Sequence, residues 1–150
     1  MTPNDYVSYP LALALKKAGF DEPCDHCYAK TDESKHELVC MTVSRDYNKP
    51  RDGEPPFLMP ICSAVPLWQA QKWLREKKGI AINVIAHGCH EKYREGKYHW
   101  EEIHLPNSNE KGPQWVTWYI YGKHPLFDTY EEALSDGLSQ MLELIDNENK

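Results

Sequence analysis

Two strand-like runs near the carboxyl end of the chain, Lys97–Leu105 and Gln114–Gly122, constrain the fold most. They flank Pro106–Pro113, a connection rich in Pro, Asn, Ser and Gly, and this pattern predicts an antiparallel hairpin with a long loop. If the two strands pair symmetrically about the loop, His104 lies opposite Trp115. This register decides which side chains share a face of the hairpin.

The predicted register gathers aromatic side chains on one face, because alternate residues of a strand share a face. This aromatic surface consists of Tyr98, Trp100, Trp115, Tyr119 and Tyr121. The opposite, inward face is expected to hold Ile103, Leu105, Val116, Trp118 and Ile120. Rings with a polar tip suit a partly wet contact, so the aromatic surface predicts a protein partner or a homodimer. The neighbouring Glu101 and Glu102 count against stacking of nucleic-acid bases, which usually needs basic neighbours.

Two helices are expected in the first half of the chain. Tyr9–Ala18 carries apolar residues at helical spacing, with Gly19 placed for a left-handed cap and Phe20 able to fold back onto the last turn. Pro66–Lys78 has a proline near its first turn and ends at Gly79.

The last helix has the clearest start signal. Thr129 and Glu132 form a T-x-x-E capping box. The apolar residues that follow are spaced for one helix face: Leu134, Leu138, Met141, Leu142 and Ile145. Gly137 inside this helix costs up to about 1 kcal/mol relative to alanine, which suggests that another backbone packs closely there.

Three further segments predict a hairpin, a loop and a strand. Two short β-prone runs, His26–Lys30 and Glu37–Val43, predict a hairpin. Tyr47–Pro60 is rich in Pro, Gly and Asn, as a surface loop is. Ile80–Ala86 is a continuous apolar run, which predicts a strand buried on both faces.

The order helix, hairpin, helix, strand, hairpin, helix excludes a regular alternation of strands and helices and favours an α+β fold. We expect an antiparallel or mixed sheet of about five strands, with about three helices packed on one face. A chain of 150 residues has the length of one domain, which is expected to span residues 1–150.

Charge and cysteine content limit the partners and the compartment. The net charge of -6 disfavours non-specific binding to nucleic acid. The amino end lacks a basic signal region and the apolar run Leu11–Leu15 is too short to cross a bilayer, so no membrane association is expected. Five cysteines, an odd number in a chain of this size, are typical of reduced intracellular thiols. We therefore expect a cytoplasmic protein.

A zinc site is one alternative hypothesis. Cys24 and Cys27 form a C-x-x-C pair. His87 and His90 form an H-x-x-H pair, and the two pairs together have the nitrogen and sulfur ligands that tetrahedral Zn²⁺ prefers. They lie far apart in the sequence, so they form a zinc-stabilised module only if the fold brings them together. A redox role would need the first thiol at a helix N-terminus, whereas a strand is expected here.

Catalysis is the other alternative. The sequence has no G-x-S-x-G, Walker, G-x-G-x-x-G or H-E-x-x-H motif, and no residue is assigned a catalytic role. His99 and His104 lie on one expected strand, however. Glu101 and Glu102 stand between them, and a histidine with a carboxylate can form an acid/base pair. A small hydrolase-like enzyme would need a pocket on which His99, His104 or His124 converge.

Three stretches resemble a known group of proteins. They are Leu15–Cys24 (LKKAGFDEPC), Pro66–Lys77 (PLWQAQKWLREK) and Thr129–Leu134 (TYEEAL). In this order, and over nearly the whole chain, they resemble a family of small uncharacterised proteins from gut Bacteroidetes genomes and from phage-like or mobile elements. The resemblance implies no known function and no catalytic residue. The family is not expected to carry a second cysteine in the segment Cys24–Cys27, which counts against a shared metal site.

The function expected from the sequence is therefore that of a small non-enzymatic binding or protein-interaction module, an accessory of a mobile element. Its expected binding region is the aromatic surface or the adjacent Pro-rich loop. No cofactor is expected outside the zinc hypothesis.

Overall fold

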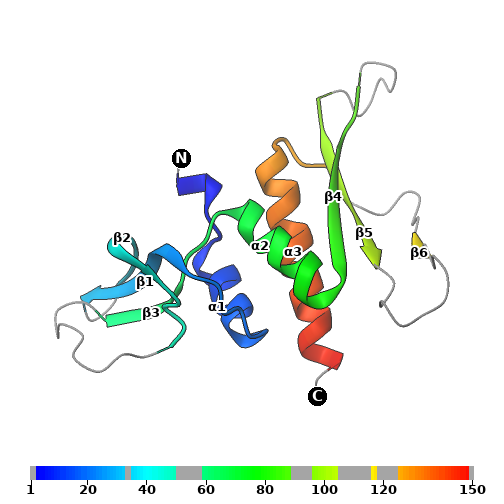
Figure 1. Ribbon diagram of the computed structural model, residues 1–150. Coiled ribbons are helices and arrows are strands. Elements are labelled where there is room, and N and C mark those ends of the chain that lie inside the picture. Colours follow the sequence, from blue (N-terminus) through cyan, green and yellow to red (C-terminus); the bar gives the residue numbers. More distant parts are fainter. Residues whose placement is uncertain are drawn as a thin grey trace. The chain divides into compact units, whose positions relative to one another are not determined.

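The fold is of the α+β class, as the order of elements predicts. The computed structural model describes residues 3–32, 35–49, 59–88, 96–104, 116–117 and 125–148 (Figure 1). The elements in chain order are a 3-10 turn η1 (Pro3–Asp5), α1 (Tyr9–Lys17), β1 (Cys24–Asp32), β2 (Lys35–Arg45), β3 (Met59–Ser63), α2 (Leu67–Lys78), β4 (Ile80–Ala86), β5 (Tyr98–His104), β6 (Val116–Thr117) and α3 (Tyr130–Glu148).

The strands form two antiparallel sheets, with strand orders β2-β1-β3 and β4-β5-β6. This corrects the expectation of one sheet, and the division begins with β3, a strand that the sequence pattern did not indicate. Met59 and Pro60 of β3 fall in the segment expected to be a loop. β3 pairs with the second edge of β1, and β4 pairs with β5 in a separate sheet. Pro60 is tolerated because β3 lies at an edge of the described sheet, where a missing N–H costs little.

The chain groups into two compact units. The first consists of Met1–Pro66 with Leu142–Lys150, and it holds α1 and the sheet β2-β1-β3. The second consists of Leu67–Met141, and it holds α2, the sheet β4-β5-β6 and the first part of α3. The single domain predicted over residues 1–150 stays a prediction.

Helix α1 ends as the sequence predicts. Gly19 has a φ of +90°, and its N–H donates to the carbonyl of Lys16 over 3.1 Å. The N–H of Phe20 donates to the carbonyl of Leu15 over 2.9 Å, and the Phe20 side chain is buried. This pair of bonds is a Schellman ending, in which the left-handed residue is a glycine because it has no Cβ to clash.

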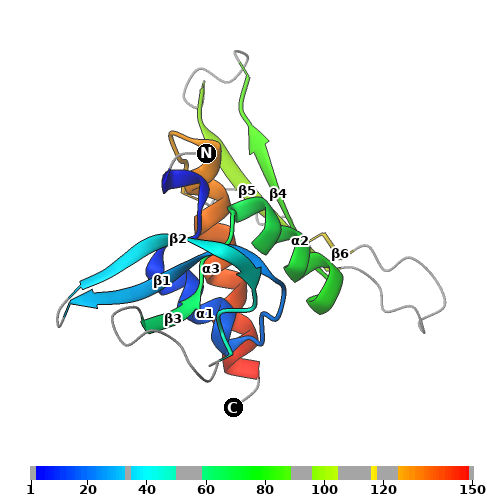
Figure 2. The same cartoon turned by 60° about the vertical axis from the view of Figure 1, so that its left-hand side comes forward.

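The first sheet contains the predicted hairpin. β1 and β2 pair antiparallel, with Tyr28 opposite Leu38, and β3 lies on the other side of β1 (Figure 2). Tyr9 at the start of α1 stacks on His36 of β2, with ring centroids 4.3 Å apart. The core of this unit includes Val7, Leu11, Leu15, Phe20, Cys27, Tyr47, Cys62 and Val65, all of them buried.

Strand β4 is buried on one face only, which corrects the expectation of burial on both. Ile80 and Ile82 are buried, whereas Asn83 and Ile85 are exposed. The reason is that β4 pairs antiparallel with β5, and continuous apolar runs are required only where helices cover both faces of a parallel sheet.

Helix α3 begins with the predicted capping box. The N–H of Glu132 donates to Oγ1 of Thr129 over 3.2 Å, and the N–H of Thr129 donates to Oε2 of Glu132 over 3.3 Å. The predicted apolar face of the helix is buried throughout: Leu134, Leu138, Met141, Leu142 and Ile145. Two N–H groups that lack a helical partner are thereby satisfied at the start of the helix.

Candidate functional site

Trp100 lies in the interior of the second unit, which contradicts its predicted place on an exposed aromatic surface. The residue is 2% exposed, and its indole N–H donates to Oδ2 of Asp136 over 2.8 Å. Its ring lies against Gly137 of α3, where an added Cβ would be 2.9 Å from ring atom Cδ2. The missing side chain of Gly137 leaves room for the indole, and Asp136 satisfies the N–H that burial removes from water. Gly137 thus accommodates a side chain and not the backbone that the sequence suggested.

The register of β5 with β6 also differs from the prediction by one residue. His104 pairs with Val116 and Ile103 pairs with Thr117, whereas symmetric pairing about the loop places His104 opposite Trp115. A shift of one residue exchanges the two faces of a strand. Ile103 lies on the face of β5 opposite Trp100, as predicted, but the buried face is that of Trp100, and Ile103 is only half-buried.

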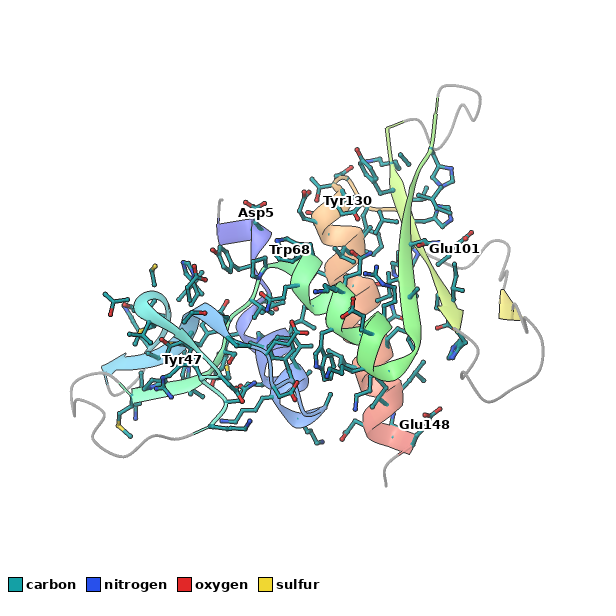
Figure 3. The ribbon with its side chains drawn as sticks, in the orientation of Figure 1. Asp5, Tyr47, Trp68, Glu101, Tyr130 and Glu148 are labelled. Carbon is teal, nitrogen blue, oxygen red and sulfur yellow. The ribbon has the colours of Figure 1, made fainter. Side chains whose placement is uncertain are left out.

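The other members of the predicted aromatic surface are Tyr98, Trp115, Tyr119 and Tyr121. Tyr98 is half-buried and meets Tyr130 edge to face, with ring centroids 6.4 Å apart, and Figure 3 places Tyr130 at the start of α3. Trp115, Tyr119 and Tyr121 lie outside the described residues. Because Trp100 is buried, a surface made of all five rings does not form as predicted.

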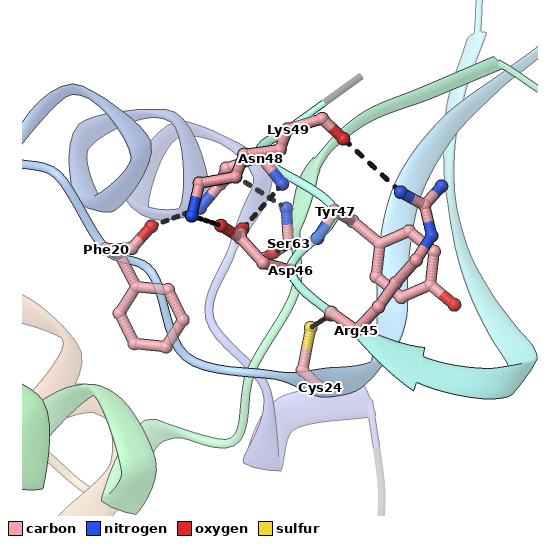
Figure 4. Close-up of polar contacts among 8 residues, drawn as sticks. All are labelled: Phe20, Cys24, Arg45, Asp46, Tyr47, Asn48, Lys49 and Ser63. Carbon is pink, nitrogen blue, oxygen red and sulfur yellow. Dashed lines mark hydrogen bonds and ion pairs between the residues drawn. The ribbon is translucent and has the colours of Figure 1, made fainter. Parts of the chain in front are cut away.

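Cys24 and Cys27 both lie on β1, buried in the first unit. Sγ of Cys24 donates to the carbonyl of His26 over 3.0 Å and lies 3.8 Å from the carbonyl of Arg45 (Figure 4). Burial raises the pKa of the Cys24 thiol, and it raises the pKa of Cys62 on β3 to about 11. Thiols with a raised pKa stay protonated at neutral pH and are poor nucleophiles and poor metal ligands.

Hydrogen bonds fix the segment that follows β2 beside these thiols (Figure 4). The amide of Asn48 donates to the carbonyl of Phe20 over 2.8 Å and accepts from the N–H of Ser63 over 3.0 Å. The hydroxyl oxygen of Ser63 accepts from the N–H of Tyr47 over 3.0 Å. These groups satisfy backbone atoms of the turn and of β3, so this polar cluster belongs to the structural framework.

The four ligands of the zinc hypothesis are divided between the parts of the chain. Cys24 and Cys27 belong to the first unit and His87 to the second, while His90 lies outside the described residues. Among the residues that the structure describes, no group of three or more His, Cys, Asp or Glu side chains is placed to hold a metal ion. The four-ligand zinc site therefore stays a prediction.

The outer face of the β4–β5 hairpin carries a chain of three polar side chains, which we call the histidine cluster. Nε2 of His87 lies 2.6 Å from Nδ1 of His99. Nε2 of His99 lies 3.3 Å from Oε1 of Glu101. The side chains of His99 and Glu101 are 17% and 16% exposed, and Figure 3 shows Glu101 directed away from α3. The cluster is therefore partly shielded from water yet lies on the face that α3 does not cover.

One set of tautomers, with an ionised Glu101 and a neutral His99, accounts for both distances in the histidine cluster. An ionised carboxylate only accepts, so Nε2–H of His99 donates to Glu101. Nδ1 of a neutral His99 then has a lone pair, which accepts the Nε2–H of His87. Both rings are held in one orientation, with one nitrogen atom of each directed at the other.

His104 belongs to a second, separate pair. Its Nε2 lies 3.7 Å from Oε1 of Glu102, and the side chain of His104 is about half exposed. Because the faces of β5 alternate, His104 and Glu102 share the face of Trp100, whereas His99 lies on the other face. Each histidine thus has a carboxylate nearby, as predicted, but the pocket in which His99 and His104 would converge does not form. His124 lies outside the described residues.

Strand β2 has an open edge that the sequence did not indicate. It is eleven residues long, and none of them is buried. Within the described ranges, β1 is the only strand that pairs with β2. Sequence patterns mark a strand but not its place in a sheet, so only the strand order identifies this edge.

Comparisons with protein families, with curated proteins and with solved structures give no match. Of the helices described, none is long and apolar enough to cross a membrane. The geometry of the β2 edge and of the histidine cluster is therefore the basis for assigning a function.

Proposed function

We propose that this chain is a non-enzymatic protein-interaction module that binds an extended segment of a protein partner along the open edge of β2. The observation that supports this function is the exposure of β2, which has eleven residues, none of them buried, and a single paired neighbour in the described part of its sheet. An edge strand offers N–H and C=O groups to another strand, and strand addition is a recurrent mode of peptide recognition.

The bonds within the sheet indicate which residues of β2 face the open edge. The carbonyl of His26 accepts from the N–H of Ala64, on the β3 side of β1. In an antiparallel ladder successive residues bond to opposite sides, so the backbone of Cys27 is directed toward β2. Cys27 lies opposite Val39, and the backbone of Cys40, the next residue, is therefore directed away from β1.

The composition of β2 suits the addition of a strand. Its central segment Leu38–Val43 has no charged residue and no proline, and it is rich in residues that favour strands. The charged residues Lys35, Glu37 and Arg45 stand outside this segment. Charges along an edge keep other strands away, so their absence from the centre leaves it open to pairing. Val43, which is 56% exposed, adds apolar surface for a partner.

A cytoplasmic setting is part of the same proposal. The thiols of Cys24, Cys40 and Cys62 are free, and Cys40 on the open edge is exposed. An exposed thiol is maintained in a reducing compartment. The resemblance to proteins of phage-like and mobile elements supports a role as an accessory of such an element.

A photo-reactive amino acid in place of Val43 tests this function in the full chain, within the cells that produce it. We expect a covalent adduct with one discrete protein, because Val43 is exposed and lies three residues from Cys40, whose backbone faces away from β1. The same amino acid in place of Arg75, on the exposed side of α2, is the control and should give no such adduct. An adduct between two copies of the chain would identify the partner as a second copy.

Substitutions at Cys40 test whether the backbone edge is the binding feature. Cys40→Pro removes an N–H that faces away from β1, and it should lower the adduct yield at Val43 by about tenfold or more. Cys40→Ser keeps the N–H and should leave the yield unchanged. An adduct equally strong in both variants, or no adduct beyond that of the Arg75 control, would contradict the proposed function.

A further inference from the structure

We propose that His87 and His99 bind a divalent transition-metal ion, such as Zn²⁺ or Ni²⁺, on the outer face of the β4–β5 hairpin. Glu101 does not touch the ion in this site but holds His99 in the orientation that binding requires. The two imidazoles come from opposite strands of the hairpin, and neither Cys24 nor Cys27 takes part.

The distance between the two nitrogen atoms suits an ion after a small movement. Nε2 of His87 and Nδ1 of His99 are directed at each other across 2.6 Å. Two nitrogen ligands at 2.0–2.1 Å from a tetrahedral zinc ion lie about 3.3 Å apart. The rings therefore need to separate by less than about 1 Å, which side-chain rotation provides without a change of the backbone.

The backbone around His87 is held by the hairpin. Its N–H donates to the carbonyl of Lys97 over 2.9 Å, and its carbonyl accepts from the N–H of Gly96 over 3.2 Å. His99 lies within β5, opposite Ile85 of β4. His99 thus stands on a paired strand, and His87, which directly follows β4, is held in place by these two backbone hydrogen bonds.

Glu101 supplies the partner that metal-binding histidines usually have. A histidine ligand commonly donates its other ring N–H to a carboxylate, which fixes the tautomer and makes the ligating nitrogen more basic. Nε2 of His99 lies 3.3 Å from Oε1 of Glu101, so Nδ1 carries the lone pair. This lone pair is directed at His87, where the ion would lie.

The ligand type determines the class of ion. Imidazole nitrogen atoms suit Zn²⁺, Cu²⁺ and Ni²⁺, whereas Mg²⁺ and Ca²⁺ prefer oxygen ligands. Two protein nitrogen atoms leave the other coordination positions to water. Cys89 and His90 follow in the sequence, but they lie outside the described residues and are no part of the proposed site.

Binding must displace the proton that lies between the two rings. In the bound state His87 carries its ring proton on Nδ1 instead of Nε2, so the ring stays neutral and the total number of bound protons is unchanged. Both facing nitrogen atoms then offer lone pairs to the ion, as a metal-binding imidazole must.

Calorimetric titration of Zn²⁺ into the metal-free full chain, with thiols kept reduced, tests the site. We expect one ion per chain. His99→Gln removes a ligand and should weaken binding at least about a hundredfold, while Glu101→Gln should weaken it about tenfold to a hundredfold. His104→Gln is the matched control, because it changes the same residue type on the opposite face of the same strand, and it should leave the affinity unchanged.

The result that overturns the assignment is binding that survives His99→Gln, or binding that falls equally in His104→Gln. The visible spectrum of the Co²⁺-loaded chain separates the two metal hypotheses without any substitution. Histidine and water ligands give no thiolate-to-metal band, whereas a strong band of this kind would place the ion on cysteines and refute the site at His87 and His99. Unfolding temperatures measured without metal establish that each variant is folded.

Discussion

Strands β5 and β2 lie in different sheets and differ in what surrounds them. At the centre of β5, Trp100 is 2% exposed, its ring lies against Gly137 and its N–H is bonded to Asp136. None of the eleven residues of β2 is buried. At Trp100 the inner face of β5 therefore belongs to the core, and the histidine cluster with His99 and Glu101 lies on the outer face. Strand β2 contributes little to the core and offers its edge instead.

Trp100→Ala is the substitution with the largest expected effect on this contrast. It should lower the free energy of unfolding by about 3–5 kcal/mol, because it empties the space beside Gly137 and removes one of the hydrogen bonds that Asp136 accepts. Urea unfolding followed by far-ultraviolet circular dichroism measures the change. A loss below about 1 kcal/mol would mean that β5 is not held through its inner face.

The second prediction concerns the thiols of the first sheet. Cys40 on β2 is exposed, whereas Cys62 on β3 is buried and its pKa is raised to about 11. At pH 8 iodoacetamide should alkylate Cys40 at least about a hundredfold faster than Cys62 in the folded chain, because the thiolate is the reacting form. The rate at Cys62 should keep rising until the pH reaches about 11.

Mass spectrometry of peptides taken at successive times gives both alkylation rates, and the urea-unfolded chain is the control. Unfolding should bring the two rates together. Equal rates in the folded chain would show that β3 is as open as β2, and the contrast within this sheet would fail.

The smallest expected effect is that of Val43→Lys on β2. The side chain of Val43 is 56% exposed, so the free energy of unfolding should change by less than about 0.5 kcal/mol. The added charge on the edge should nevertheless reduce pairing with another strand. Urea unfolding measures the first quantity, and a loss above about 1 kcal/mol would show that β2 is needed for the core.

Local signals predicted the parts of the fold that depend on neighbouring residues. Gly19 and Phe20 end α1, and Thr129 and Glu132 start α3, because both types of cap use backbone groups only a few residues away. The hairpin of β1 with β2 was likewise predictable from two β-prone runs and the polar turn between them.

Features that depend on distant residues could not be predicted in this way. The direction of Trp100 is set by Asp136 and Gly137, which come much later in the chain and leave no mark on the pattern of β5. Met59 and Pro60 end a segment whose composition is typical of a loop, and only their pairing with β1 makes them part of a strand. Tertiary contacts override local preference at both places.

The candidate sites also combine features that depend on neighbouring residues with features that depend on distant ones. The pairing of His99 with Glu101 follows from the alternation of side chains along a strand, and it was within reach of the sequence. The approach of His87 to His99 depends on the register of β4 with β5, and the open edge of β2 depends on the strand order. The sequence of a single segment determines neither the register of two strands nor the order of strands in a sheet, so both features could be identified only from the structure.

Pro60 makes the two edges of the first sheet different in the backbone donors that they offer. At the β3 side of the described sheet, this residue has no N–H to offer to a further strand, whereas the β2 side keeps its donors. A further strand added at Pro60 would lack one backbone hydrogen bond, so this position of the β3 side of the described sheet is a poor place for strand addition. A partner that binds in the way proposed above would accordingly extend the sheet from its β2 side.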